Sequence, residues 1–366
     1  MRYTRLWVGL GLVIVASFAV LGYFGREIYR QEPPIPNRVV TTGGDVLFTG
    51  QQIRDGQNVW QSMGGQEVGT VWGHGAYVAP DWSADFLHRE LVYLLDGWAQ
   101  AEHQRPFDQL GPEARAALEA RLQAEIRANT YDPATGDVTI SPRRGEAIRA
   151  VGEHYDRIFG DDASPELVKL RDACAIPAAM VPDSARRQAL NAFFFWASWA
   201  CSTNRPASDV TYTNNWPAEA LIGNAPTGSM VVWSVVSFVL LLAGIGALAW
   251  YYAVLRGRSD DGHAMPVDDP LLALRPTPSM QATLKYFWVV AALIVVQIGL
   301  GAVTAHYGVE GSGFYGVPLA KWLPYSVTRT WHTQLGIFWI ATAWLATGLY
   351  IAPAVSGHEP KFQRFG

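Results

Sequence analysis

The residue whose type and position most suggest chemistry is His332. It is the only one of eight histidines that lies inside a long stretch without charged residues. A polar ring placed in hydrocarbon must be paired, ligated or exposed to a water-filled site. A neutral imidazole there suits the axial ligand of a b-type haem, with its other ring nitrogen held by a backbone or hydroxyl acceptor. A hydrogen bond to a neighbouring helix is an equally good interpretation of this residue alone.

Arg329 stands three residues before His332, on the same face if the segment is helical. Its planar guanidinium could pair with a haem propionate. Positive residues that merely flank a membrane span are common, and the spacing alone favours that simpler interpretation.

A second group, His306, Glu310 and Phe314, recurs at intervals of four residues. In a helix the three side chains would share one face. A quinol head group needs a hydrogen-bond partner at each hydroxyl, groups that take two protons and an aromatic surface, and these residue types supply them. Three glycines between residues 308 and 313 weaken a helix, so spacing alone favours a solvated interfacial loop.

The segment from Trp72 to Trp82 is rich in glycine and aromatic residues and lacks the period of a helix or a strand, which predicts an ordered loop. Within it, Tyr77 could touch the edge of a buried cofactor, although packing beneath a domain is the default. His74 has no partner at a ligand spacing, so no metal site is expected there.

The elements that must position these residues begin with four stretches free of charge. A helix needs about 20 apolar residues to cross a bilayer, and each stretch is long enough. The first is too long, and too bulky at its end, for a cleaved signal peptide, so we expect it to remain as an anchor. The four run between Arg5 and Arg26, from Met230 to Leu255, from Lys285 to about Ala305 and from Thr330 to about Ala354.

The basic residues near these spans predict an orientation, because they favour the cytoplasm. Arg2 and Arg5 place the N-terminus inside, and the basic residues of 256–285 and 361–364 then fall on the same side. The result is a large, net acidic domain outside the cytoplasm, from Arg26 to about Gly228.

That domain is expected to be folded and mixed in structure. Residues 112–129 begin with proline and carry an apolar residue at every fourth position, which predicts an amphipathic helix. The turn residues from Asp132 to Asp137, followed by Val-Thr-Ile, predict a short strand. Ser184 could cap a further helix, whose run of Phe and Trp must be buried or face lipid.

Composition narrows the function classes. The 366 residues are 49% hydrophobic and only 16% charged, which favours a membrane protein. A net charge of −4 gives no basic surface for a phosphate backbone, so no nucleic-acid partner is expected. Cys174 and Cys201 are 27 positions apart and no CxxCH motif occurs, which excludes c-type cytochromes, zinc ribbons and disulfide scaffolds.

Five segments are specific when taken together. They are Gly-Ala-Tyr-Val-Ala-Pro (75–80), Phe-Phe-Phe-Trp-Ala-Ser-Trp-Ala (193–200), the Thr-Asn-Arg-Pro and Tyr-Thr-Asn-Asn-Trp-Pro strings within 203–217, the set His306, Glu310 and Phe314, and Arg-Thr-Trp-His-Thr-Gln-Leu (329–335). The chain that carries them resembles, over its whole length, the quinol-dependent nitric oxide reductases of the haem-copper oxidase superfamily.

The resemblance implies a mostly α-helical membrane protein, with four transmembrane helices and a large extracytoplasmic cytochrome c-like α+β domain without haem c. It implies that His332 is an axial ligand of a low-spin haem b and that Tyr77 lies near haem propionates. It also implies that His306, Glu310 and Phe314 form the quinol pocket.

On this basis the chain divides into five parts. They are an N-terminal anchor (1–25), the extracytoplasmic domain (26–228), a second membrane helix (229–255), a cytoplasmic loop (256–282) and the first two helices of the catalytic subunit (283–366). The implied location is the inner (cytoplasmic) membrane of a bacterium, crossed several times. Membrane lipid and quinol are expected partners, and no cytochrome c is required as a donor.

The chain departs from the family after His332. The family joins two nitric oxide molecules into nitrous oxide and water at a high-spin haem b3 facing a non-haem iron, held by three histidines and a glutamate on later helices. Here only His358 follows. We therefore expect the chain alone to lack that centre and the second haem b ligand, and to be inactive without its C-terminal half or a second chain. A cloned fragment, a truncated gene product and one part of a split protein all fit.

The sequence thus predicts the electron-input half of a quinol-oxidising nitric oxide reductase. The alternative is a non-catalytic membrane assembly or electron-transfer module, which a co-purifying partner carrying the missing histidines would distinguish. A membrane receptor shares the layout of the first two spans. The short loop from Arg258 to Ser279, however, leaves no room for the signalling helix that a receptor would need.

Overall fold

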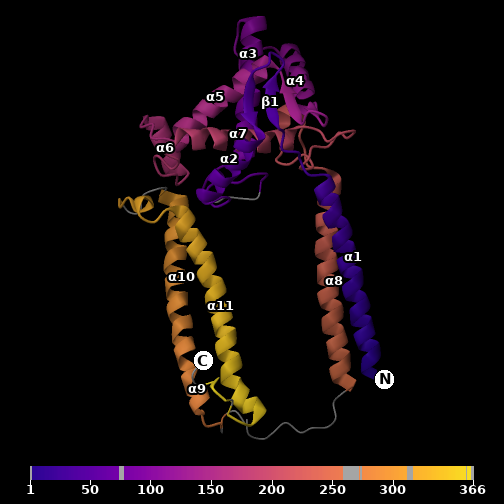
Figure 1. Ribbon diagram of the computed structural model, residues 1–366, viewed down its shortest axis with the longest axis vertical. Helices are drawn as coiled ribbons and strands as arrows, with labels where there is room; N and C mark the ends of the chain where they lie inside the picture. Colours follow the sequence, from indigo (N-terminus) through magenta and orange to yellow (C-terminus); the bar gives the residue numbers. More distant parts are fainter. Residues whose placement is uncertain are drawn as a thin grey trace.

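The computed structural model describes residues 2–73, 78–258, 272, 274–310, 316–359 and 361–363 (Figure 1). Within these ranges the chain is mostly helical. The α-helices are α1 (Arg2–Arg30), α2 (Gly50–Ser62), α3 (Trp82–His103), α4 (Pro112–Arg127), α5 (Pro142–Phe159), α6 (Pro165–Ala173), α7 (Ser184–Ser202), α8 (Gly228–Arg258), α9 (Pro278–Ala282), α10 (Leu284–Glu310) and α11 (Tyr325–Ser356), with short 3-10 turns η1 (Phe107–Gln109), η2 (Ala220–Ile222) and η3 (Leu319–Lys321).

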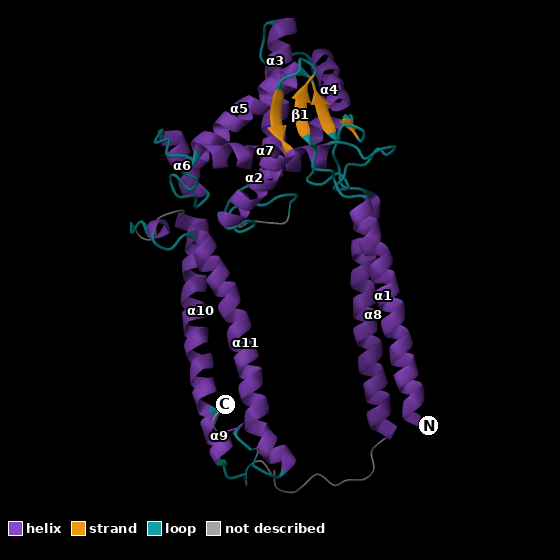
Figure 2. Cartoon of the chain, viewed as in Figure 1, coloured by secondary structure: helices purple, strands orange, loops and turns teal. Residues whose placement is uncertain are grey.

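The part of the chain that follows α1 and precedes α8 contains one small sheet among its helices, in the upper part of Figure 2. Its strands are β1 (Arg38–Thr41), β2 (Val46–Thr49), β3 (Tyr131–Asp132) and β4 (Asp137–Ile140), in the spatial order β2-β1-β4-β3. β1 pairs antiparallel with β2 and parallel with β4, while β3 and β4 form a hairpin. The predicted turn and strand at 132–140 are therefore confirmed, and the domain is mixed as expected.

The helices of this domain begin at side-chain caps, which accept orphan backbone N–H groups. Thr49 and Gln52 form a reciprocal capping box at α2, and Asp81 accepts from the Ala84 N–H at α3. The prediction that Ser184 caps α7 is wrong. Asp183 is the cap and accepts from the Ala185 N–H at 2.8 Å, so the helix begins one position earlier and Ser184 is its first residue.

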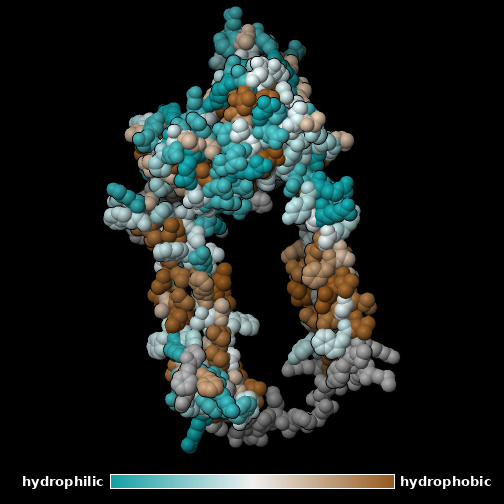
Figure 3. Space-filling model, in the orientation of Figure 1, coloured by the Kyte–Doolittle hydropathy of each residue, from teal (hydrophilic) through white to brown (hydrophobic). Residues whose placement is uncertain are grey.

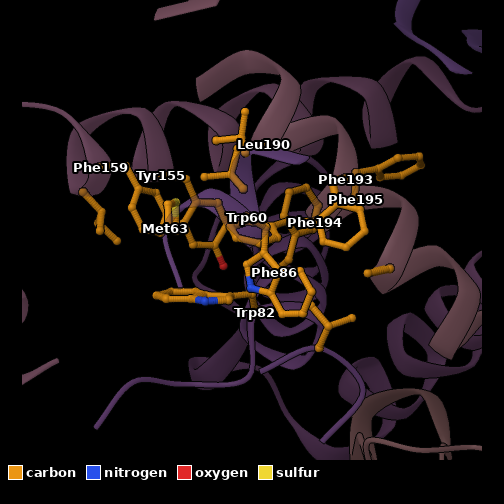
Figure 4. Close-up of a cluster of buried hydrophobic side chains, with 14 of the residues drawn as sticks. Trp60, Met63, Trp82, Phe86, Tyr155, Phe159, Leu190, Phe193, Phe194 and Phe195 are labelled. Atoms are coloured by element: carbon orange, nitrogen blue, oxygen red, sulfur yellow. The ribbon is translucent and has the colours of Figure 1, made fainter. Parts of the chain in front are cut away.

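Aromatic side chains fill the core of the domain, as Figure 4 shows. The Trp82 ring stacks on Phe194 at 5.6 Å between centroids and meets Phe159 edge-on at 5.3 Å. Offset and edge-to-face pairs of this kind add stability beyond their buried area. Phe193, Phe194 and Phe195 of α7 are all buried, so the aromatic run expected to be buried or face lipid is buried within the domain.

Four helices are long and apolar enough to cross a membrane, which confirms the four stretches free of charge. Their spans are Trp7–Arg30, Gly228–Leu255, Pro278–Tyr307 and Tyr325–Ser356. Figure 3 shows their apolar surface beneath the more polar domain. α10 and α11 pack on each other, yet 11% or less of any span's most apolar window is buried. Most of this surface therefore faces lipid or further membrane protein.

Candidate functional site

His332 lies on α11 and faces α10. Its ring is partly buried, and Nδ1 stands 2.9 Å from the backbone carbonyl oxygen of Gln297. A carbonyl oxygen only accepts, so Nδ1 must carry the proton and donate it. Nε2 then holds the lone pair, and no described residue hydrogen-bonds it. The predicted acceptor for the second ring nitrogen is therefore present as a backbone group.

A glycine on α10 makes this approach possible. A Cβ atom built on Gly301 would lie 2.7 Å from His332 Cε1 and 2.9 Å from Nδ1, closer than real contacts allow. Gln297 stands one turn earlier on α10, and its side-chain Oε1 accepts from Trp339 Nε1 at 2.6 Å. The Gln297 backbone carbonyl of α10 thus holds the His332 ring. The Gln297 side chain joins the same two helices a second time, at Trp339 further along α11.

This arrangement fits a haem ligand on chemical grounds. Histidines that bind a metal almost always donate their other ring N–H to a carbonyl or carboxylate, which fixes the tautomer and the ring plane. His332 shows that pattern at Nδ1, and Nε2 is left unbonded by the described residues. It also confirms the interhelical hydrogen bond that was the competing interpretation, so the two interpretations are compatible.

Arg329 has a carboxylate partner from the domain formed by the sheet and helices α2 to α7, which we call the soluble domain. Its Nη1 lies 3.8 Å from Glu67 Oε1, and the neighbouring Thr330 hydroxyl donates to Glu67 Oε2 at 2.5 Å. The two charged side chains are 29% and 20% exposed. Arg329 is therefore part of a junction between the domain and α11, not a solvated flanking charge.

The predicted quinol residues are only partly described. α10 remains helical through Glu310, so His306 and Glu310 stand one turn apart despite the glycine between them. Beside His306, the buried Tyr307 donates its hydroxyl to the carbonyl of Leu323, which joins α10 to the segment before α11. Phe314 and Tyr77 lie outside the described residues, and of Glu310 only the backbone is described.

The two cysteines form no disulfide. Cys174 and Cys201 are both buried and free. Burial raises the pKa of both thiols, since the charged form is disfavoured away from water. Both side chains therefore pack within the domain as neutral thiols.

Comparison with known families decides the identity. Residues 36–218, which hold the sheet and helices α2 to α7, match the family described as the NorB cytochrome c-like domain of nitric oxide reductase. The chain belongs to the NorB family of nitric oxide reductases. Residues 281–366, with α10 and α11, match cytochrome c and quinol oxidase polypeptide I, the haem-copper oxidase family. A comparison with curated proteins gives no match.

The family resemblance drawn from the motifs is thus confirmed. The NorB-like chain is a membrane protein of an oxidoreductase family whose members use haem, and its nitric oxide reductase and haem-copper oxidase segments lie in the order expected. The NorB match ends at residue 218, before α8, and the oxidase match begins within α9.

Sequence reasoning missed three residues that shape the site. Gln297 is a polar residue in a membrane span, a signal of the same kind as His332 itself. Gly301 gave no signal, because only the crossing of α10 and α11 makes its missing side chain matter. Glu67 gave none either, since it lies 262 positions before Arg329 and is brought there by the tertiary fold.

Proposed function

We propose that this chain is the electron-input part of a quinol-oxidising nitric oxide reductase, the enzyme that converts two nitric oxide molecules to nitrous oxide and water. The observation that carries the proposal is the His332 ring, held at Nδ1 by the Gln297 carbonyl and unbonded at Nε2 by any described residue. It lies in the segment that matches the haem-copper oxidases.

In this proposal His332 Nε2 would hold the iron of a low-spin haem b. The haem, when bound, supplies a one-electron acceptor. Gln297 fixes the imidazole plane through its carbonyl, and Gly301 leaves room for the ring. Arg329 and Tyr77 would pair with the propionates, which suits a guanidinium fork and a phenol hydroxyl.

Quinol would bind at His306, Glu310 and Phe314. His306 and Glu310 stand one turn apart at the end of α10, a spacing that lets two side chains meet one small ligand. Glu310 would accept a proton as quinol is oxidised, His306 would bond a hydroxyl, and Phe314 would offer its ring. Cytochrome c would not be needed as a donor.

The reducing centre itself would be completed by protein beyond these two helices. Among the described residues no group of three or more His, Cys, Asp or Glu side chains could hold a metal ion. We propose that the high-spin haem b3, the non-haem iron and the second haem b ligand are held by a C-terminal half or a second chain. The orientation proposed is a cytoplasmic N-terminus in a bacterial inner membrane, with the large domain on the outer side.

Replacing the proposed ligand tests the proposal directly. The sample is the chain purified in mild detergent together with any polypeptide that accompanies it. In its reduced-minus-oxidised spectrum, His332→Ala should lower the haem b content by about tenfold or more, at least the loss usual for removing an outer-shell partner. His103→Ala, an exposed histidine at the end of α3, is the matched control and should keep the band. A parent complex that contains its partner polypeptide but no haem b, or a His332→Ala complex that keeps haem b, would refute the assignment.

Glu310→Gln tests the quinol site separately. In the complex with the partner polypeptide, quinol oxidation should slow by about 100-fold, as expected for loss of a positioned proton acceptor, while the haem b spectrum stays unchanged. Glu102→Gln, an exposed carboxylate of α3, should leave the rate alone. Loss of haem in Glu310→Gln would instead assign that residue a structural role.

A further inference from the structure

One carboxylate of the soluble domain reaches the helix that carries His332. Glu67 stands in the loop between α2 and α3, in a segment that we call the 63–70 loop. Its two carboxylate oxygens face different partners on the first turns of α11, Oε1 towards the Arg329 guanidinium at 3.8 Å and Oε2 towards the Thr330 hydroxyl at 2.5 Å. His332 follows Thr330 by two residues.

The loop holds Glu67 in place through its own backbone. The Glu67 N–H donates to the Gly64 carbonyl at 3.2 Å, and the Val68 N–H donates to the Gly65 carbonyl at 3.1 Å. Val68 is buried, and its carbonyl accepts from Trp82 Nε1 in the aromatic core at 2.9 Å. The carboxylate is therefore presented by a fixed turn anchored on both sides.

The loop also lies directly on α11. Gly64 has a φ of +120°, and a Cβ built there would come within 2.4 Å of Ser326 Cβ. Tyr307, Ala320 and Tyr325 belong to the same buried cluster as the aromatic core of the domain. The contact between domain and membrane helices is thus packed as well as charged.

We propose that Glu67 is a positioning residue of the haem b site, which fixes Arg329 and offsets its positive charge. The proposal rests on the proposed function, in which His332 holds the haem and Arg329 faces a propionate. It adds that the soluble domain helps to set the redox potential of that haem. This influence on the redox potential would be a role for the cytochrome c-like domain that does not require the domain to bind haem c.

The charges fix the sign of the effect. A positive charge near a haem favours the reduced form, and a negative charge favours the oxidised form. Both side chains are 29% exposed or less, so water screens them only in part. Removing the Glu67 carboxylate should raise the midpoint potential, and removing the Arg329 guanidinium should lower it.

The experiment is a spectroelectrochemical titration of haem b in the full chain, purified with any polypeptide that accompanies it. Glu67→Gln should increase the ratio of reduced to oxidised haem at a fixed potential by up to about tenfold, or ~59 mV for one electron. Arg329→Gln should shift it the opposite way, and the double variant should return towards the parent. Glu67→Asp should restore most of the parent value.

Two controls separate charge from packing. Thr330→Val removes one hydrogen bond without changing charge and should shift the potential little. Glu102→Gln removes a carboxylate from a surface ion pair with Arg121 and should not shift it. Shifts of the same sign in Glu67→Gln and Arg329→Gln would indicate general disruption and overturn the proposal.

Haem content distinguishes this proposal from the one on which it rests. A parent chain that is purified with its partner polypeptide and still contains no haem b overturns both. A second outcome overturns only the role of Glu67. In it, His332→Ala loses haem b, but Glu67→Gln and Arg329→Gln keep the same haem b midpoint potential as the parent. Glu67→Gln alone could fail to bind haem b. In that case, haem b bound by the double variant Glu67→Gln/Arg329→Gln, which removes both charges, supports the proposal, and loss of haem b from the double variant overturns it.

Discussion

At the scale of the residue, the site depends on one missing side chain as much as on the groups present. His332 can donate to the Gln297 carbonyl only because α10 carries glycine at position 301. The nearest ring atom lies 2.7 Å from where a Cβ atom of residue 301 would stand. Polar residues within spans are costly unless paired. Here His332 donates to the Gln297 backbone and Trp339 to the Gln297 side chain, so both hydrogen bonds join the two helices.

Gly301→Ala should therefore displace the His332 ring. The added methyl group would lie 2.7 Å from Cε1, and overpacking of this kind typically costs about 1–3 kcal/mol. We expect a lower haem b content and a shifted α band in the visible spectrum. Gly299→Ala, two residues earlier on α10 with nothing within 4 Å of the added atom, should match the parent. Equal spectra for all three chains would contradict the close approach.

At the scale of the element, the domain is organised by the crossing of α2 and α7. Gly56 of α2 is buried, and a Cβ built on it would fall 1.9 Å from the Ala189 carbonyl oxygen of α7. The backbones are thus in direct contact, which lets Trp60 of α2 reach Phe193 of α7 at 5.6 Å between ring centroids. The small residue allows the aromatic core to close.

Gly56→Ala should destabilise the domain by about 1–3 kcal/mol, the usual range for overpacking against backbone. A lower midpoint in denaturant, followed by tryptophan fluorescence in detergent, would measure it. Gly43→Ala is the matched control, because its Cβ would meet only Thr41 Oγ1 at an ordinary 3.5 Å. A Gly56→Ala midpoint equal to that of Gly43→Ala would rule out the tight crossing.

At the scale of the whole molecule, one soluble domain is connected to two sets of membrane helices. α1 precedes it and α8 follows it, while α11 meets it through the 63–70 loop (Figure 1). None of the most apolar window of α1 or α8 is buried within the described protein. Without a hydrophobic force between helices in lipid, such faces associate through packing and hydrogen bonds.

The chain should accordingly purify with additional membrane protein when its source supplies it. We expect a polypeptide rich in intramembrane histidine to elute with the chain from a size-exclusion column in mild detergent, and haem b to co-elute. Mass spectrometry of the peak is the measurement. A monodisperse chain that binds haem b alone would contradict the proposed division of the haem ligands between two segments.

Much of the architecture follows from the sequence by itself. Charge is so costly in hydrocarbon that the four spans are visible as stretches without it, and the structure places helices there. The amphipathic pattern of 112–129 likewise predicts α4, whose Leu118, Leu122 and Ile126 are buried. Local patterns suffice in these cases because one element and its solvent decide the outcome.

Local pattern also named His332 and Arg329, since a polar group in or beside an apolar span stands out on its own. What it left open was their partners. The roles of Gln297 and Gly301 arise only where α10 crosses α11, and that of Glu67 only where the 63–70 loop contacts the first turns of α11. Contacts between groups tens to hundreds of residues apart depend on how the elements pack, and only the tertiary structure decides that.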